Sequence, residues 1–292
     1  GRPLSSQEDA LDWSEGCHRV DFDVYPYFYP SSQRIRMLTA WPCFAFMRAV
    51  ARQHRLPWGF YVEIDERNWP FQQNPKEASS ECAWTAVAQG ADYLNSFIHR
   101  AFATGCDARP ERWDHLGRNL RLMRSLGPLL AATSRPSAAV ALYFPTAQQA
   151  VDDGYALPSY LFAAVQQAFG EGDLLLEEPV ARSGRVDYRG GLLLSKVRLL
   201  DSRVIGPLAN WVKRGGVLAL DQWPQTDEQG RPVDLRASLG APEALAAWQS
   251  LSCGRGRILW LPSGFNAAYK EAVEASRNAE ACELPATLRP QA

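Results

Sequence analysis

Residues 58–65, WGFYVEID, decide the fold class of this chain. Apolar and aromatic residues lead up to Glu63 and acidic residues follow, which is typical of a buried strand that ends in polar side chains. The same pattern continues on both sides, with further strands predicted at 19–29 and 90–99. Helices are predicted at 34–55, interrupted at Pro42, and at 75–89. Apolar strands that alternate with helices predict βαβ units and a parallel sheet.

The pattern of apolar and polar residues changes near residue 133, after a long amphipathic helix predicted at 110–132. Beyond it, short apolar runs alternate with helical segments. Strands are predicted at 138–144, 173–177, 191–194, 217–220 and 257–261. Helices are predicted at 155–169 and at 201–214, the second with an acidic N-cap at Asp201 and a basic end. This pattern favours an open, doubly wound sheet. We therefore expect one domain over 1–132, a second α/β domain over 133–276 and a tail over 277–292.

Composition excludes several functions for a chain of 292 residues. A formal charge of −1 argues against nucleic-acid binding, which needs a basic surface. No run approaches the roughly 20 apolar residues that span a bilayer, so no membrane association is expected. Six scattered cysteines and four histidines show no metal-ligand spacing, so we expect no metal. The even number of cysteines permits disulfides, but the length of the chain favours buried free thiols, and we therefore expect a cytoplasmic protein.

The aromatic content of 11% has two explanations. Aromatic side chains dominate the burial of large cores. They also stack on the flat faces of sugars, which would mark a carbohydrate site. Composition alone favours the core.

Glu63 is the candidate catalytic residue, because parallel strands display function at their carboxyl ends. A carboxylate there can attack the anomeric carbon of a sugar or act as a general base. Trp69 and Phe71 follow closely, and Trp69 is a candidate for substrate binding. The alternative is a solvated or ion-paired acid at the end of a strand.

Other candidates for substrate binding lie at the ends of the two neighbouring strands. Asp21 and Asp23 are two residues apart, so they share one face of a strand, which Tyr25 continues. They could bind substrate hydroxyls or hydrogen-bond the catalytic carboxylate, and equally they could cap the amides of loops. His99 and Arg100 end the third strand, where His99 is either a structural hydrogen-bonding group or a sugar contact.

Two glycine-rich spots precede strands, Gly215-Gly216 and Gly254-Arg255-Gly256. Phosphate-binding loops follow a strand and open a helix instead. Both spots are therefore predicted to be turns, and no nucleotide cofactor is expected.

Several segments together resemble a known family. The segments 58–73 (WGFYVEIDERNWPFQQ) and 81–100 (ECAWTAVAQGADYLNSFIHR) resemble the last part of the barrel of clan A glycoside hydrolases, in particular the family 42 β-galactosidases. The stretch 20–30 (VDFDVYPYFYP) is similar to the sixth barrel strand. The strings 211–220 (WVKRGGVLAL) and 253–262 (CGRGRILWLP) resemble strand entries of the family's second domain.

The resemblance implies a fold and an activity. The fold is the last strands of a (β/α)8 barrel, followed by an amidotransferase-like, flavodoxin-like α/β domain. Glu63 takes the position of the nucleophile in a retaining, β-galactosidase-like hydrolase, and a second carboxylic acid protonates the leaving group. Such chemistry acts on a carbohydrate and requires no cofactor. A partial barrel exposes strand edges, so we expect a homo-oligomer or a complementary chain that completes it.

The chain departs from the family at three places. The Asn-Glu pair that carries the acid/base in this clan is absent, and His99 stands where many relatives have a Trp. The second domain has no nucleophile elbow, which argues against an amidotransferase. The missing acid/base leaves one alternative open: a non-catalytic carbohydrate-binding or assembly protein.

Overall fold

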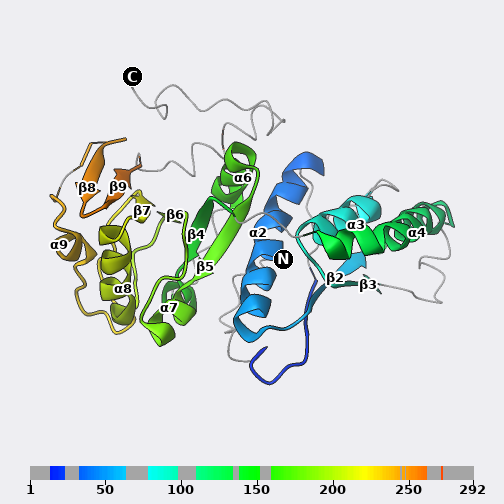
Figure 1. Cartoon of the computed structure of the whole chain (residues 1–292), viewed down its shortest axis with the longest axis horizontal. Coiled ribbons are helices and arrows are strands. Elements are labelled where there is room, and N and C mark those ends of the chain that lie inside the picture. The colour runs from blue at the N-terminus through cyan, green and yellow to red at the C-terminus, as the bar shows by residue number, and fades with distance from the viewer. Residues whose placement is uncertain are drawn as a thin grey trace. The chain divides into compact units, whose positions relative to one another are not determined.

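The computed structural model describes residues 14–23, 33–63, 78–97, 110–133, 138–151, 159–243, 245–246, 248–261 and 271. The chain divides between residues 137 and 138 into two compact units (Figure 1). Unit 1 contains the described residues up to 133, and unit 2 contains those from 138 onward.

Unit 1 is a sheet of three parallel strands in the order β1-β2-β3, and each successive pair is connected through a helix. The strands are β1 (Val20–Phe22), β2 (Trp58–Glu63) and β3 (Tyr93–Phe97). The helices are α2 (Gln33–His54), α3 (Ala78–Ala88) and α4 (Pro110–Ala132), and α3 packs on α4 (Figure 1). This sequential order is that of neighbouring strands in a (β/α)8 barrel.

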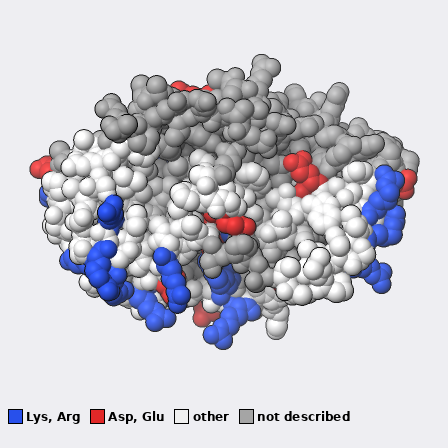
Figure 2. Space-filling model, turned by 45° about the horizontal axis from the view of Figure 1, so that its top comes forward, with Lys and Arg blue, Asp and Glu red and all other residues white. Residues whose placement is uncertain are grey.

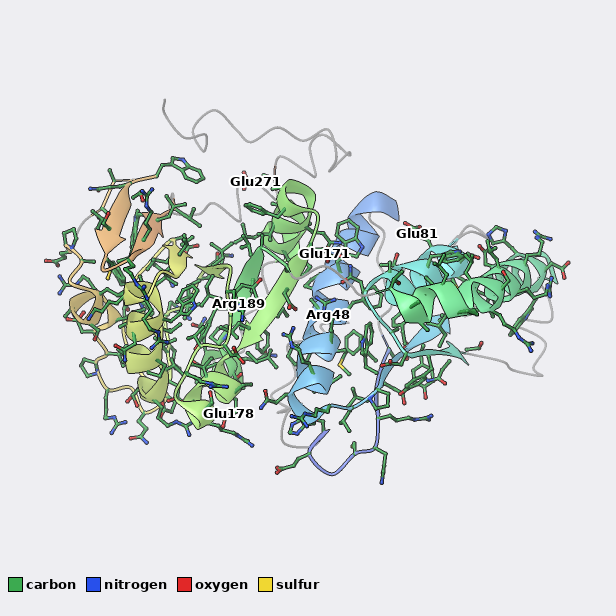
Figure 3. All side chains as sticks on the ribbon, in the orientation of Figure 1. Arg48, Glu81, Glu171, Glu178, Arg189 and Glu271 are labelled. Carbon is green, nitrogen blue, oxygen red and sulfur yellow. The ribbon has the colours of Figure 1, made fainter. Side chains whose placement is uncertain are left out.

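The core of unit 1 lies between β2 and helix α2. Trp58 and Phe60 alternate along β2 and are buried, and both rings pack on Phe44 of α2, with centroids 6.3 and 4.9 Å away. Arg48, labelled in Figure 3, donates hydrogen bonds to the backbone and side-chain oxygens of Gln89 (3.3 and 2.6 Å). The ring contacts fix α2 against the strand that carries Glu63, and the bonds of Arg48 fix it to the end of α3.

Helix α2 runs unbroken through Pro42, where the sequence predicted an interruption. A proline inside a helix removes one hydrogen bond and costs about 3 kcal/mol. Pro42 is buried, and the turns after it bury Phe44, Met47 and Val50. Burial of those side chains at about 25 cal/mol per Å² offsets the loss.

Unit 2 is a six-stranded sheet in the order β5-β4-β6-β7-β9-β8. The strands are β4 (Val140–Phe144), β5 (Gly172–Leu176), β6 (Gly191–Leu194), β7 (Val217–Leu220), β8 (Ser250–Cys253) and β9 (Gly256–Trp260). The first five in spatial order are parallel, and β8 pairs antiparallel with β9. The order reverses between β4 and β6, as in doubly wound folds of the flavodoxin type.

Five helices of unit 2 are described: α5 (Thr146–Val151), α6 (Ser159–Phe169), α7 (Glu177–Ser183), α8 (Ser202–Lys213) and α9 (Leu235–Leu239). Helix α8 buries Val204, Leu208 and Val212 in the core cluster that also contains Leu218 and Leu220 of β7. The predicted acidic N-cap of this helix is confirmed.

That N-cap is Asp201, which accepts a hydrogen bond from the backbone N–H of Arg203 (2.8 Å) and pairs with its guanidinium (2.6 Å). The Arg203 guanidinium and backbone N–H hold the pKa of Asp201 below its usual range, against the opposing effect of burial. The cap therefore remains charged at neutral pH.

Both glycine-rich spots are turns, as predicted. Gly254 has a φ of +60° between β8 and β9, a conformation that favours glycine. A Cβ on Gly256 would lie 2.0 Å from the carbonyl oxygen of Val212 and 2.3 Å from that of Gly216. Glycine is required at Gly256 because two backbone segments press against it.

The predicted α/β class with parallel sheets is thus confirmed. None of the described helices is both long and apolar enough to cross a bilayer. On the face shown in Figure 2, the described Lys and Arg side chains stand in several groups, with uncharged and acidic side chains among them.

Candidate active site

The carboxyl ends of the three strands of unit 1 lie along one edge, because the strands are parallel. Glu63 is the last residue of β2 and is in register with Phe97, the last residue of β3. Asp23 directly follows β1. The backbone therefore places two of the predicted site residues, Asp23 and Glu63, at the same edge of one sheet.

The other predicted site residues, Tyr25, Trp69, His99 and Arg100, lie outside the described residues, as does the side chain of Glu63. Their roles remain predictions. The neighbouring positions of β2 are described and show how the two faces of this strand differ.

Strand β2 has one apolar face and one open to polar groups. Trp58, Phe60 and Val62 are buried, whereas Tyr61 is half-buried. Successive residues of a strand alternate between its two faces. Glu63 therefore lies on the same face of β2 as Gly59 and Tyr61. The face shared by Gly59 and Tyr61 is opposite the one that packs on helix α2.

On this second face, two side chains of β3 reach across β2 to β1. The hydroxyl of Tyr93 donates to the carbonyl of Val20 (3.1 Å), and Nδ2 of Asn95 donates to Oδ1 of Asp21 (2.8 Å). The side chain of Tyr93 passes over Gly59 of β2, where the absence of a side chain leaves room for it. These bonds tie the outer two strands of the sheet together.

Asp21 is the centre of a small charged cluster. It pairs with Nε of Arg19 (3.5 Å), and the guanidinium of Arg19 lies 5.2 Å from the ring centre of Tyr93. Burial and, secondly, the carboxylate of Asp21 raise the pKa of Tyr93 well above its usual value. Asp21 therefore bonds to side chains on its own sheet face, whereas the sequence suggested either a substrate or loop amides as its partners.

Tyr93, Asn95 and Gly59 were not among the site residues predicted from the sequence. A glycine inside an otherwise apolar strand marks a place where another group approaches the backbone closely. That signal was present at Gly59.

We expect Gly59→Ala to destabilise unit 1 by about 2 kcal/mol. A Cβ at this position would lie 2.2 Å from Cε2 of Tyr93, whose hydroxyl is held by Val20. Urea unfolding of the variant measures the loss. Adding Tyr93→Ala should restore part of it, and a double variant no more stable than the sum of the single changes would contradict the proposed clash.

A second polar centre lies at the carboxyl ends of the strands of unit 2. The carboxylate of Glu177, which follows β5, is 1% exposed. One oxygen accepts from the hydroxyl of Tyr143 (3.0 Å) and the backbone N–H of Asp201 (2.9 Å), and the other from the N–H of Ala147 (2.6 Å). It joins β4, α5 and the start of α8, and the sequence analysis missed it.

Burial raises the pKa of Glu177 from 4.5 to about 7, although the three hydrogen bonds act in the opposite direction. The folded state then binds this proton more tightly than the unfolded state does. Protonated Glu177 therefore contributes fully to the free energy of unfolding below pH 4.5, and this contribution is lost as the pH rises through 7. We expect the free energy of unfolding to fall by about 3 kcal/mol over this range.

Glu177→Gln should remove that dependence, because an amide does not titrate. Urea unfolding of both proteins between pH 4.5 and 8 gives the free energy of unfolding at each pH. The difference between the two curves isolates Glu177 from other groups. Parallel curves would show that Glu177 does not titrate in this range.

Among the described residues, no group of three or more His, Cys, Asp or Glu side chains is placed to hold a metal ion.

No family model matches the sequence, and no curated protein matches it. Solved structures do match. A β-galactosidase from Rahnella sp. R3 has a TM-score of 0.67 at 14% identity, and the match covers 95% of this chain and 52% of that one. A GH42 β-galactosidase from G. stearothermophilus has a TM-score of 0.64 at 14% identity, covering 94% and 51%.

The β-galactosidase of the haloarchaeon Halorubrum lacusprofundi has a TM-score of 0.66 at 15% identity, with 92% and 52% of the two chains covered. This chain therefore spans about half the length of these structures. At the level of the fold, they confirm the resemblance that the sequence indicated.

Proposed function

We propose that this chain supplies the nucleophile-bearing part of a retaining glycoside hydrolase that acts on β-galactoside-like substrates. The observation that carries the proposal is the place of Glu63, at the carboxyl end of the middle strand of three parallel strands. The fold similarity to GH42 β-galactosidases supports it.

In the proposed reaction, an oxygen of Glu63 attacks the anomeric carbon as the bond to the leaving group breaks. A second carboxylic acid protonates the departing oxygen, and the sugar is held as an ester on Glu63. Water, deprotonated by that second group, then attacks the same carbon and releases the sugar with its configuration retained. No cofactor takes part.

Asp23 lies beside this edge and is proposed to bind substrate hydroxyls. Tyr25, Trp69, His99 and Arg100 are proposed to complete the sugar site, with the aromatic rings stacked on the sugar face.

The acid/base is proposed to come from a complementary chain, because the Asn-Glu pair is absent from this one. β1 and β3 each pair on one side only within the described part of the chain. Open edges of a parallel sheet favour the addition of further strands. Such strands would close a barrel and bring a second carboxyl group near Glu63.

Unit 2 is proposed to be the amidotransferase-like accessory domain of this enzyme, with a role in assembly. We also propose a cytoplasmic location, because Cys253 and Cys43 are protonated thiols. The Sγ of Cys253 donates to the carbonyl of Leu239 (3.2 Å), and burial raises the pKa of the Cys43 thiol to about 12.

The test is an assay of the product of the intact gene on aryl β-galactosides, beside Glu63→Gln. An activated aryl leaving group departs without protonation, so ester formation on Glu63 depends on the nucleophile alone.

The absent Asn-Glu pair favours the second candidate, a non-catalytic carbohydrate-binding or assembly protein. That candidate predicts sugar binding without turnover and no effect of Glu63→Gln on either.

A further inference from the structure

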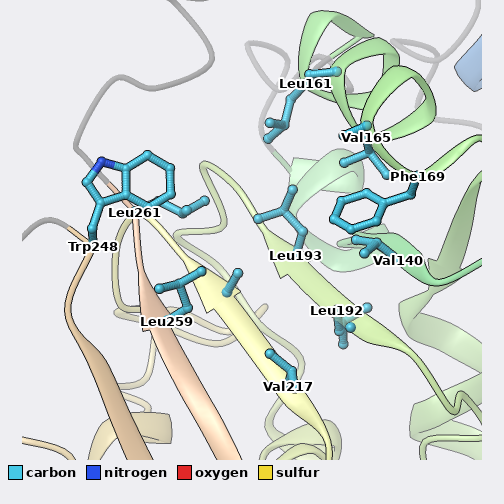
Figure 4. Close-up of a pocket in the computed structure, with 14 residues that line it drawn as sticks. Val140, Leu161, Val165, Phe169, Leu192, Leu193, Val217, Trp248, Leu259 and Leu261 are labelled. Carbon is cyan, nitrogen blue, oxygen red and sulfur yellow. The ribbon is translucent and has the colours of Figure 1, made fainter. Parts of the chain in front are cut away.

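One face of the sheet in unit 2 has an apolar cavity of about 570 Å³ (Figure 4). Helix α6 forms one wall, with Phe169 at its end. Strands β4, β6, β7 and β9 form the floor, and Trp248 and Leu261 lie on the opposite side. Every described residue that lines the cavity is glycine, alanine or a larger apolar residue.

The floor of this cavity belongs to the middle of the sheet. β7 pairs with β6 on one side and β9 on the other. Its residues Leu218 and Leu220 are fully buried on the side of α8, whereas Val217 is 42% exposed and Ala219 is half-buried. Parallel strands in the middle of a sheet are normally covered on both faces.

The uncovered area has the width of one helix. Helix α6 packs on β4 and β5, and Figure 4 shows it beside the cavity. Neighbouring helices lie about 8–10 Å apart, and neighbouring strands about 4.8 Å apart. A helix beside α6 would therefore lie two strands further along, over β6 and β7.

We propose that residues 265–279 of this chain form that helix. At about 100° per residue, one side of it is apolar and the other is charged. The apolar side contains Phe265, Ala268, Tyr269, Ala272, Val273 and Ala279 together with the small Ser276, and the charged side carries Lys270, Glu271, Glu274 and Arg277. Small alanines let a helix approach a sheet closely, and the rings of Phe265 and Tyr269 would fill the cavity.

The start of the segment supports this occupant. Leu261 itself lines the cavity at the end of β9, and the segment begins four residues later. Gly264 stands at the N-cap position of a helix that starts at residue 265, and glycine is accepted there. A helix of this length extends about 22 Å, enough to span the sheet.

Glu271 is a described residue, labelled in Figure 3, and it is helical and exposed. That is the environment expected on the charged side. A short tether also gives the segment an effective concentration in the millimolar range, which favours it over a second copy of the chain.

Two alanines in the segment provide a matched pair of variants. Ala272 lies on the apolar side, and Ala267 lies on the charged side. Ala272→Asp would place a carboxylate against the apolar cavity, whereas Ala267→Asp would leave it in water. Both are made in the full chain carrying Ala219→Cys, whose thiol reports access to the cavity.

Alkylation of Cys at position 219, followed by site-resolved mass spectrometry, should be at least about tenfold faster in Ala272→Asp than in Ala267→Asp. Hydrogen exchange of residues 265–279 should accelerate in the same variant only. Equal alkylation rates and equal exchange in both variants would overturn the proposal. Protection that increases with protein concentration would overturn it in favour of a second copy.

Discussion

Glu63→Gln is expected to lower turnover of aryl β-galactosides by more than about 1,000-fold. An amide keeps the size of the side chain, but it cannot form the glycosyl ester. An activated leaving group should not rescue this variant, because the lost step is the attack itself and not protonation. The measurement is the initial rate on activated and unactivated aryl galactosides with the product of the intact gene.

The matched control is Glu81→Gln, which changes an exposed carboxylate on α3 in the same unit. It should leave turnover unchanged. A 2-deoxy-2-fluoro galactoside gives a second measurement, since the adduct it forms should map to the peptide that contains Glu63. Turnover that survives Glu63→Gln, or an adduct on another residue, would show that the nucleophile is assigned wrongly.

Gly256→Ala is expected to destabilise unit 2 by about 4 kcal/mol. The added Cβ would press on the carbonyl oxygens of Val212 and Gly216, at 2.0 and 2.3 Å. Both are backbone atoms, so neither can rotate away as a flexible side chain would. The packing of α8 against β9 must change, and urea unfolding or the melting temperature measures the cost.

Gly206→Ala is the control in the same unit, and its expected effect has the opposite sign. Gly206 lies inside α8 with nothing within 4 Å of an added Cβ. Alanine there should stabilise the helix by about 0.5–1 kcal/mol. If both alanines had similar effects, local crowding would not explain the requirement for Gly256.

Much of the fold could be predicted because strands and helices have different hydrophobic periods. The predicted bounds of β6 and β7 agree with the structure residue for residue. Helix α7 was missed because it begins at Glu177, directly after the last residue of β5. No loop residue separates the two, so only the acidic pair Glu177-Glu178 marks the change.

Prediction of the site was limited to positions at strand ends. Parallel strands bring their carboxyl ends together, and so Asp23 and Glu63 could be assigned to one edge from the sequence. The bond from Asn95 to Asp21 spans 74 positions of the chain and depends on strand register. Register follows from the packing of whole strands, which local patterns do not contain.

All strands of the six-stranded sheet come from residues 140–260, and each pairs with a strand that is next or next but one along the chain. Such pairings close short loops and form quickly. The three-stranded sheet is synthesised before the six-stranded one, and within the described residues β1 and β3 each have one unpaired edge. We therefore expect the first half of this chain to need an early partner during synthesis, one that covers those edges.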